Sequence, residues 1–200
     1  ENNYTDISVI TNGRMFSYPD FCRKIISAGL NFIIFSIHGH EPATNDAIYR
    51  TKGAHEQLIA GIKKIIPYKK GEAWATTVVN KMNFTCLEKI QELLFSLKMP
   101  RWRIEHLTQN EHNPHYRYKE LAVRLIEIKP YLDQLKIFKF RKFGSSLPRC
   151  CFHKKEKFID SNPAFNYYLT QEETEKNRGH GTFLTPCKNC LQKPNCTGIR

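Results

Sequence analysis

Four short strand-like segments alternate with amphipathic helical ones over the first part of the chain, and this alternation constrains the fold more than any other feature. The strand-like segments are 7–11, 31–37, 73–80 and 101–107, and the first three are rich in β-branched and aromatic residues. Between them, apolar residues recur at helical spacing, as Leu58, Ile62 and Ile65 do, and a last helix is expected at about 116–128. Such an alternation requires a parallel sheet with right-handed crossovers, either doubly wound or part of a barrel.

In both architectures the functional residues gather at the carboxyl ends of the strands. In this sequence those ends are 12–13, 36–39, 80–83 and 107–110, and all carry polar or glycine residues. Asn80 and Asn83 either line a cavity there or cap a turn. The four ends together are therefore where we expect a site.

The charge of the chain suits an anionic partner. Lys and Arg number 31 against 19 Asp and Glu, for a formal net charge of +12, and basic residues are densest over 136–157. That stretch is either a solvated basic face or a nucleic-acid-binding surface.

No run of 18 apolar residues is present, which predicts no membrane span. The N-terminus has no signal-peptide pattern, so a cytoplasmic location is expected. The sequence indicates that the chain begins directly at a strand and ends without a closing element, so we expect a fragment of a longer protein.

Cysteines mark a second region, after about residue 140. Of the seven cysteines, five lie at or beyond position 150, and the other two, Cys22 and Cys86, are expected to be structural. Cys187, Cys190 and Cys196 have the short spacing of a metal site, and the fourth ligand would be Cys150 or Cys151. We expect a reducing compartment, in which disulfides between these cysteines are disfavoured. Spacing alone fits zinc and an iron–sulfur cluster equally well.

Several motifs appear in a fixed order along the chain. A strand ends in Thr-Asn-Gly (11–13), the next in Ser-x-x-Gly (36–39), Arg50 precedes Gly-Ala, and Val-Asn-x-x-Asn (79–83) follows the third strand. Cys-x2-Cys-x5-Cys followed by Thr-Gly-Ile ends the chain. This order resembles the radical S-adenosylmethionine (SAM) enzymes, and the tail resembles their SPASM or twitch auxiliary-cluster extension.

The resemblance implies an α/β fold in two parts. Residues 1–140 would be the C-terminal part, about four βα units, of a partial TIM-type barrel, and residues 141–200 a loop-rich cysteine extension. It implies that Ser36 binds the ribose or methionine end of SAM, that Arg50 faces its carboxylate and that Leu107 packs near the adenine. It also favours a 4Fe–4S cluster on Cys150, Cys187, Cys190 and Cys196, with Cys150 preferred to Cys151.

The implied reaction is reductive cleavage of SAM to a 5′-deoxyadenosyl radical that takes a hydrogen atom from the substrate. The substrate would be a peptide or protein, and the electron donor a flavodoxin or ferredoxin. The family's Cys-x3-Cys-x2-Cys loop and Gly-Gly-Glu stretch are absent, so the chain alone is expected to be inactive, and no catalytic residue is assigned. The alternative is a zinc-stapled, basic nucleic-acid-binding protein.

Overall fold

The computed structural model describes residues 7–68, 73–107, 118–160 and 187–190. Its strands are β1 (Ser8–Thr11), β2 (Phe32–Ser36), β3 (Ala73–Val79), β4 (Arg101–His106) and β5 (Lys142–Ser145). Its α-helices are α1 (Pro19–Ser27), α2 (Pro42–Tyr49), α3 (Ala54–Ile65), α4 (Leu87–Ser96), α5 (Tyr118–Leu121) and α6 (Leu125–Gln134). Five 3₁₀ turns join them, namely η1 (Arg14–Ser17), η2 (Phe84–Cys86), η3 (Ile137–Lys139), η4 (Arg149–Cys151) and η5 (Glu156–Phe158).

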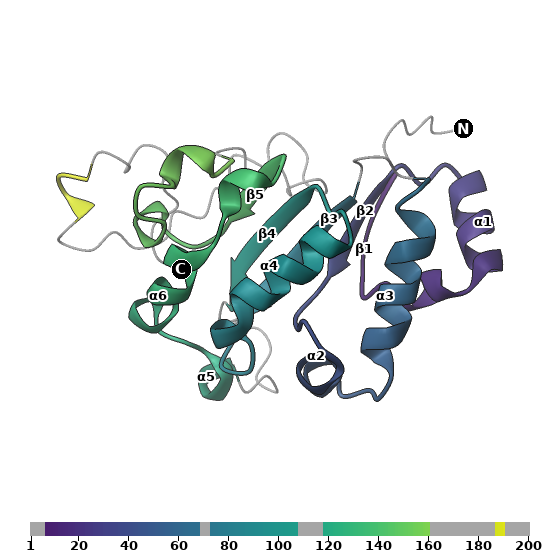
Figure 1. Ribbon diagram of the computed structural model, residues 1–200, viewed down its shortest axis with the longest axis horizontal. Coiled ribbons are helices and arrows are strands. Elements are labelled where there is room, and N and C mark those ends of the chain that lie inside the picture. The colour runs from purple at the N-terminus through teal and green to yellow at the C-terminus, as the bar shows by residue number, and fades with distance from the viewer. Residues whose placement is uncertain (1–6, 69–72, 108–117, 161–186, 191–200) are drawn as a thin grey trace, which may run out of the picture.

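The five strands form one parallel sheet in the order β1-β2-β3-β4-β5, so each strand pairs with its neighbours in sequence. Right-handed crossovers between sequential parallel strands place the connecting helices on the same face of the sheet. Figure 1 shows α1, α3, α4 and α6 on that face. The predicted parallel α/β sheet is therefore confirmed.

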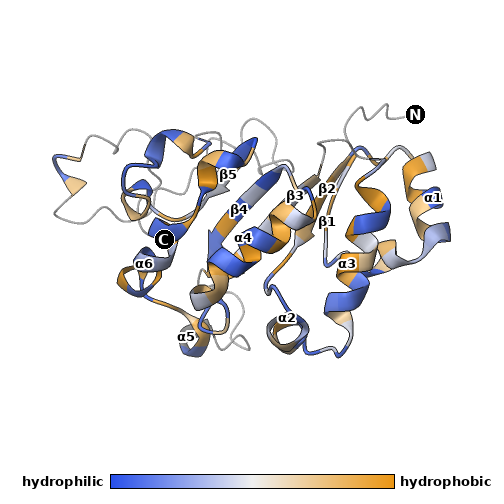
Figure 2. Ribbon diagram, in the orientation of Figure 1, coloured by the Kyte–Doolittle hydropathy of each residue, from blue (hydrophilic) through white to orange (hydrophobic). Residues whose placement is uncertain are grey.

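The core lies between the sheet and these helices. One row of side chains crosses the sheet on this face, with Phe35, Ala75, Trp102 and Phe143 paired in register and all buried. From the helices, Leu58, Ile62 and Leu94 are completely buried against the sheet. Figure 2 shows apolar residues along β1 and β2, whereas β4 is largely hydrophilic, and polar residues lie on the outer sides of the helices.

Helix α3 approaches the turn after β1 unusually closely. A Cβ at Gly61 would lie 2.4 Å from the carbonyl oxygen of Gly13 and 3.0 Å from Phe16 Cβ. Only glycine permits this distance between α3 and η1. The contact fixes the end of β1 against the helix layer.

The structure differs from the sequence prediction at three places. It contains α2 and β5, which the alternation of segments did not predict. The helix expected at 116–128 is instead α5 and α6, separated at the extended residue Arg124, whose backbone N–H donates to Glu127 Oε2 at 3.0 Å. Thr85 and Glu88 have the spacing of a capping box, but Cys86 is the N-cap of α4 and makes no side-chain cap.

No helix in the described ranges has the length and apolar character that crossing a membrane requires.

Candidate functional site at the carboxyl edge of the sheet

Asn83 ties the ends of β2 and β3 together. It is completely buried, its Nδ2 donates to the carbonyl oxygens of His38 at 3.0 Å and Val78 at 2.9 Å, and its Oδ1 accepts from the backbone N–H of Asn80 at 2.8 Å. Asn80 Oδ1 in turn accepts from Met82 N–H at 2.8 Å. Of the two roles the sequence left open for these asparagines, the structure shows the turn-stabilising one.

A second asparagine holds the loop that follows β2. Asn45, on α2, is buried, and its Oδ1 accepts from the backbone N–H groups of His38 at 3.2 Å and Gly39 at 3.1 Å. A Cβ at Gly39 would lie 2.6 Å from Asn45 N, so glycine is required by this close approach. No sequence pattern points to Asn45, since its role depends on the packing of α2 over the strand end.

The three residues expected to bind SAM lie as follows. Ser36 is the last residue of β2 and is half-buried, and Leu107 directly follows β4 and is half-buried. Because the strands are parallel, these two residues lie at the same edge of the sheet. Arg50 is the C-cap of α2, has a left-handed φ of 53° and is exposed. The convergence of the three on one cavity stays a prediction.

Tyr49 connects the end of α2 to the end of β2. Its hydroxyl donates to the carbonyl oxygen of Ser36, and its ring centroid lies 5.6 Å from that of His38. Burial raises the pKa of Tyr49, so it stays a neutral donor. Arg50 is thus anchored one residue from a side chain that contacts Ser36, a link that the sequence did not reveal.

His38 is held neutral. Its Nδ1 accepts the backbone N–H of Val78 at 3.2 Å, which places its proton on Nε2. Burial lowers its pKa to about 4. His38 is therefore a fixed, uncharged hydrogen-bonding group at the strand end rather than a group that titrates near neutrality.

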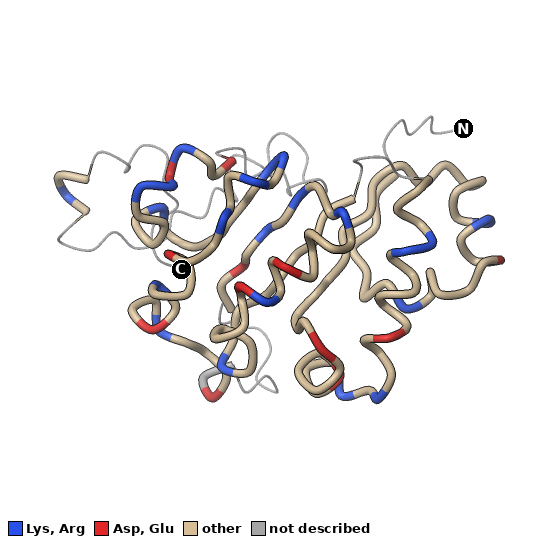
Figure 3. Tube along the Cα trace, viewed as in Figure 1, with Lys and Arg blue, Asp and Glu red and all other residues tan. Residues whose placement is uncertain are grey.

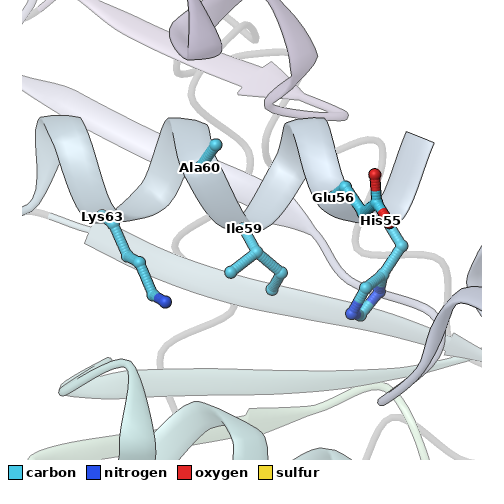
Figure 4. A pocket seen from close by; sticks show the side chains of 5 residues that line it. All are labelled: His55, Glu56, Ile59, Ala60 and Lys63. Carbon is cyan, nitrogen blue, oxygen red and sulfur yellow. The ribbon is translucent and has the colours of Figure 1, made fainter. Parts of the chain in front are cut away.

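The sticks in Figure 4 show a groove along the side of α3. Its volume is about 370 Å³, and its lining residues are His55, Glu56, Ile59, Ala60 and Lys63. The backbone N–H of His55 donates to Asp46 Oδ1 at 2.7 Å, but its buried Nδ1 has no hydrogen-bond partner among the described residues. Burial lowers the pKa of His55, against the opposing effect of Asp46. None of the site residues predicted from the sequence lines this groove.

The described cysteines of the second region differ in exposure. Cys150 is exposed whereas Cys151, its neighbour on η4, is buried at 5% in the core. Cys187 and Cys190 are half-buried and lie on one turn, where Cys190 N–H donates to Cys187 O at 3.3 Å. Cys196 lies outside the described residues. Within those residues, no group of three or more Cys, His, Asp or Glu side chains is placed to hold a metal ion.

Several basic side chains of 136–157 are used internally. Lys155 Nζ donates to the carbonyl oxygens of Leu132, Asp133 and Leu135 at the end of α6, at 3.3, 2.5 and 2.7 Å. Arg149 donates to two carbonyls near η5. Figure 3 shows further Lys and Arg positions, in blue, at β5 and along the turns after it.

Comparison with known proteins adds no family. No family model matches the chain, and no curated protein matches it.

Proposed function

We propose that the chain is part of a radical SAM enzyme that binds SAM at the carboxyl edge of its sheet and carries a 4Fe–4S cluster in its cysteine-rich region. One observation carries the proposal. The parallel strands follow sequence order from β1 to β5, with helices on one face. A doubly wound sheet reverses its strand order at a switch point, whereas a barrel does not. Sequence order therefore supports a sector of a barrel.

The edge offers the groups that SAM would need. Ser36 presents a hydroxyl and Leu107 an apolar side chain from the ends of β2 and β4. Arg50 presents a guanidinium, whose planar fork suits a carboxylate. SAM, when bound, supplies the radical chemistry. The residues of this chain would bind it, orient it and exclude water.

The cysteine region offers soft ligands. Cys187 and Cys190 are already on one turn, and Cys150 is exposed while Cys151 is buried. Thiolates are the ligands that iron–sulfur clusters use. This set, completed by Cys196, would hold the cluster, which supplies electron transfer or substrate binding when present.

The test is anaerobic reconstitution of the chain with iron and sulfide. We expect about four iron atoms per chain and a brown protein with broad violet absorption. Cys190→Ser should lose this iron without unfolding the sheet, as measured by circular dichroism. The matched control is Cys22→Ser, because Cys22 is buried on α1 and should keep full iron content. A colourless protein with stoichiometric zinc, or full iron in Cys190→Ser, would overturn the proposal.

A SAM-binding measurement tests the sheet separately. Equilibrium dialysis with radiolabelled SAM should show binding that weakens in Ser36→Ala and Arg50→Met. Lys52→Met is the control, because Lys52 is an exposed cation two residues from Arg50. Equal binding by all four proteins would contradict the assigned roles.

A further inference from the structure

Two exposed phenylalanine rings lie side by side on the surface, one from the turn before β5 and one from the turns after it. Phe138, on η3, is 53% exposed and Phe158, on η5, is 40% exposed, and their ring centroids lie 5.9 Å apart. Their neighbours Ile137 and Ile159 are buried, so both turns are seated on the core while these rings project outward. We call Phe138 and Phe158 the ring pair.

Hydrogen bonds between distant segments hold the ring pair in place. Lys155, beside η5, donates from Nζ to the carbonyl oxygen of Leu135 at 2.7 Å, and Leu135 directly precedes the N-cap residue of η3. That N-cap residue, Lys136, donates its backbone N–H to Gln91 Oε1 on α4 at 2.6 Å. Both turns are therefore fixed to each other and to the helix layer. Groups that are already ordered lose little conformational entropy when a ligand binds, which favours recognition.

The segments that carry the ring pair are strongly basic. Residues 136–158 contain eight Lys and Arg but a single acidic residue, Glu156. The Lys157 ammonium lies 5.1 Å from the centroid of the Phe158 ring. Lys142 faces Asp160 at 3.7 Å, whereas five other cations are exposed and form no ion pair with a described acidic residue, namely Lys136, Lys139, Arg141, Lys154 and Lys157. Such a concentration of one charge creates a field that attracts polyanions.

Exposed rings together with exposed cations fit single-stranded nucleic acid. Bases stack on aromatic side chains, while Lys and Arg neutralise the phosphates between them. In a duplex the bases are already stacked on one another, so outward-facing rings favour a single strand. An acidic peptide offers no series of flat aromatic faces. Membrane binding depends on a large buried apolar area, and two phenylalanine rings supply little of it.

We propose that the ring pair and the exposed cations of 136–157 form a binding surface for single-stranded nucleic acid. Phe138 and Phe158 stack on bases, and Lys139 and Lys157, next to them in sequence, contact phosphates. Stacking does not read base edges, so this surface tolerates many sequences. The inference goes beyond the proposed SAM and cluster sites and depends on neither of them.

The test measures binding of short fluorescein-labelled oligo(dT) and oligo(U) to the chain by fluorescence anisotropy at several salt concentrations. We expect binding that weakens as salt rises, because phosphate contacts release counterions. The oligo(dT)·oligo(dA) duplex of equal length should bind about tenfold more weakly, since its bases cannot stack on the rings. Binding of either single strand supports the inference, and the tighter of the two identifies DNA or RNA.

Substitutions separate stacking from charge. Phe138→Ala should weaken binding by about tenfold without changing the salt dependence, because it removes a stacking face and no charge. Lys139→Met should weaken binding and reduce the slope of log affinity against log salt by about 0.7, the value for one phosphate contact on a single strand. If Phe138→Ala does not fold, Phe138→Leu replaces it, because leucine keeps an apolar side chain but has no aromatic face.

The matched controls lie on the opposite edge of the sheet, at α1 (Figure 1). Tyr18, directly before α1, is 53% exposed like Phe138, and Tyr18→Ala should leave binding within about twofold of the parent chain. Lys24 is an exposed cation on α1, and Lys24→Met removes the same charge as Lys139→Met. Its binding should also stay within about twofold.

Four outcomes would overturn the inference. They are binding of neither oligonucleotide, equal affinity for single strand and duplex, unchanged affinity in both Phe138→Ala and Phe158→Ala, and attachment to phosphatidylserine–phosphatidylcholine vesicles without oligonucleotide binding. The third would show attraction of polyanions by charge alone, and the fourth would assign the ring pair to a membrane surface. Because the measurements use neither iron nor SAM, failure here would leave the proposed function standing.

Discussion

The edge of the sheet at β2 and β3 and the region around η4 and η5 are stabilised in different ways. At the edge, short buried amides bind the backbone, as Asn83 and Asn45 do, beside a continuous apolar core. Around η4 and η5, long basic side chains reach across to carbonyl groups, as Lys155 and Arg149 do. A short buried side chain has little entropy to lose, whereas a long one has much. The edge is therefore suited to holding fixed geometry, and the second region depends more on additional ties.

The largest effect is expected at Asn83. Asn83→Ala removes three hydrogen bonds and leaves buried backbone groups of His38, Val78 and Asn80 without this partner. We expect the free energy of unfolding to fall by about 3–4 kcal/mol, measured by urea denaturation. Asn12→Ala is the control, because exposed Asn12 makes one local hydrogen bond, to Arg14 N–H. If the free energy of unfolding falls no more in Asn83→Ala than in the control, the contrast between the two regions is not supported.

The pH dependence of stability is the next effect. His38 has a folded pKa of about 4, below its ordinary value of 6.5, so the unfolded chain binds more protons between these values. The free energy of unfolding should therefore decrease as pH falls from 6.5 to 4, by at most about 3 kcal/mol from this residue. His38→Gln should reduce that dependence, because glutamine does not titrate and can accept from Val78 N–H. An identical pH profile for both proteins would contradict the lowered pKa.

In the second region, Lys155→Met should cost about 1–2 kcal/mol, since it removes donation to three carbonyls at the end of α6. Hydrogen exchange should increase in α6 and η5 and stay unchanged in β2 and β3. The exposed Lys139 provides the control variant Lys139→Met. Increased exchange across the whole sheet would show that the two regions unfold together.

The smallest changes in stability are expected from substitutions of the adjacent residues Cys150 and Cys151, which should differ in their effects. Cys151→Ser places a hydroxyl in the core and should cost about 1–2 kcal/mol, with little change in iron content. Cys150→Ser, at an exposed position, should leave stability unchanged but lower iron content after reconstitution. The reverse pattern of iron loss would assign Cys151 as the ligand.

The parts of this structure that the sequence predicts are those with local periodicity. Strands β1 to β3 were predicted because apolar residues run through them, β4 because polar and apolar residues alternate in it, and α3 because its apolar residues repeat every three or four positions. Strand β5 was missed, since its four residues include Lys142, Gly144 and Ser145 and only pairing with β4 makes them a strand. Tyr49 and Asn45 were missed for the same reason, as their partners lie on another element.

The ion pair between Arg103 and Glu105 could not have been found from the sequence of β4 alone. Arg103 and Glu105 alternate with Trp102 and Ile104, a pattern that reads as an ordinary strand with one polar face. Only the register with Thr76 and Gly144 shows that this face is shielded and carries a charge pair. Cys150 and Cys151 present the same difficulty, because adjacent identical residues differ only in the side of the chain from which they project.

The order of the strands has a consequence for how the protein forms during synthesis. Each strand pairs with the one made just before it, so every βα unit emerging from the ribosome finds its docking surface already present. Each pairing closes only the loop of one crossover, as between Ser8 and Phe32, and the entropy cost of closing a loop rises slowly with its length. The sheet can therefore grow in the order of synthesis, and each edge that a later strand covers stays exposed only until that strand is made.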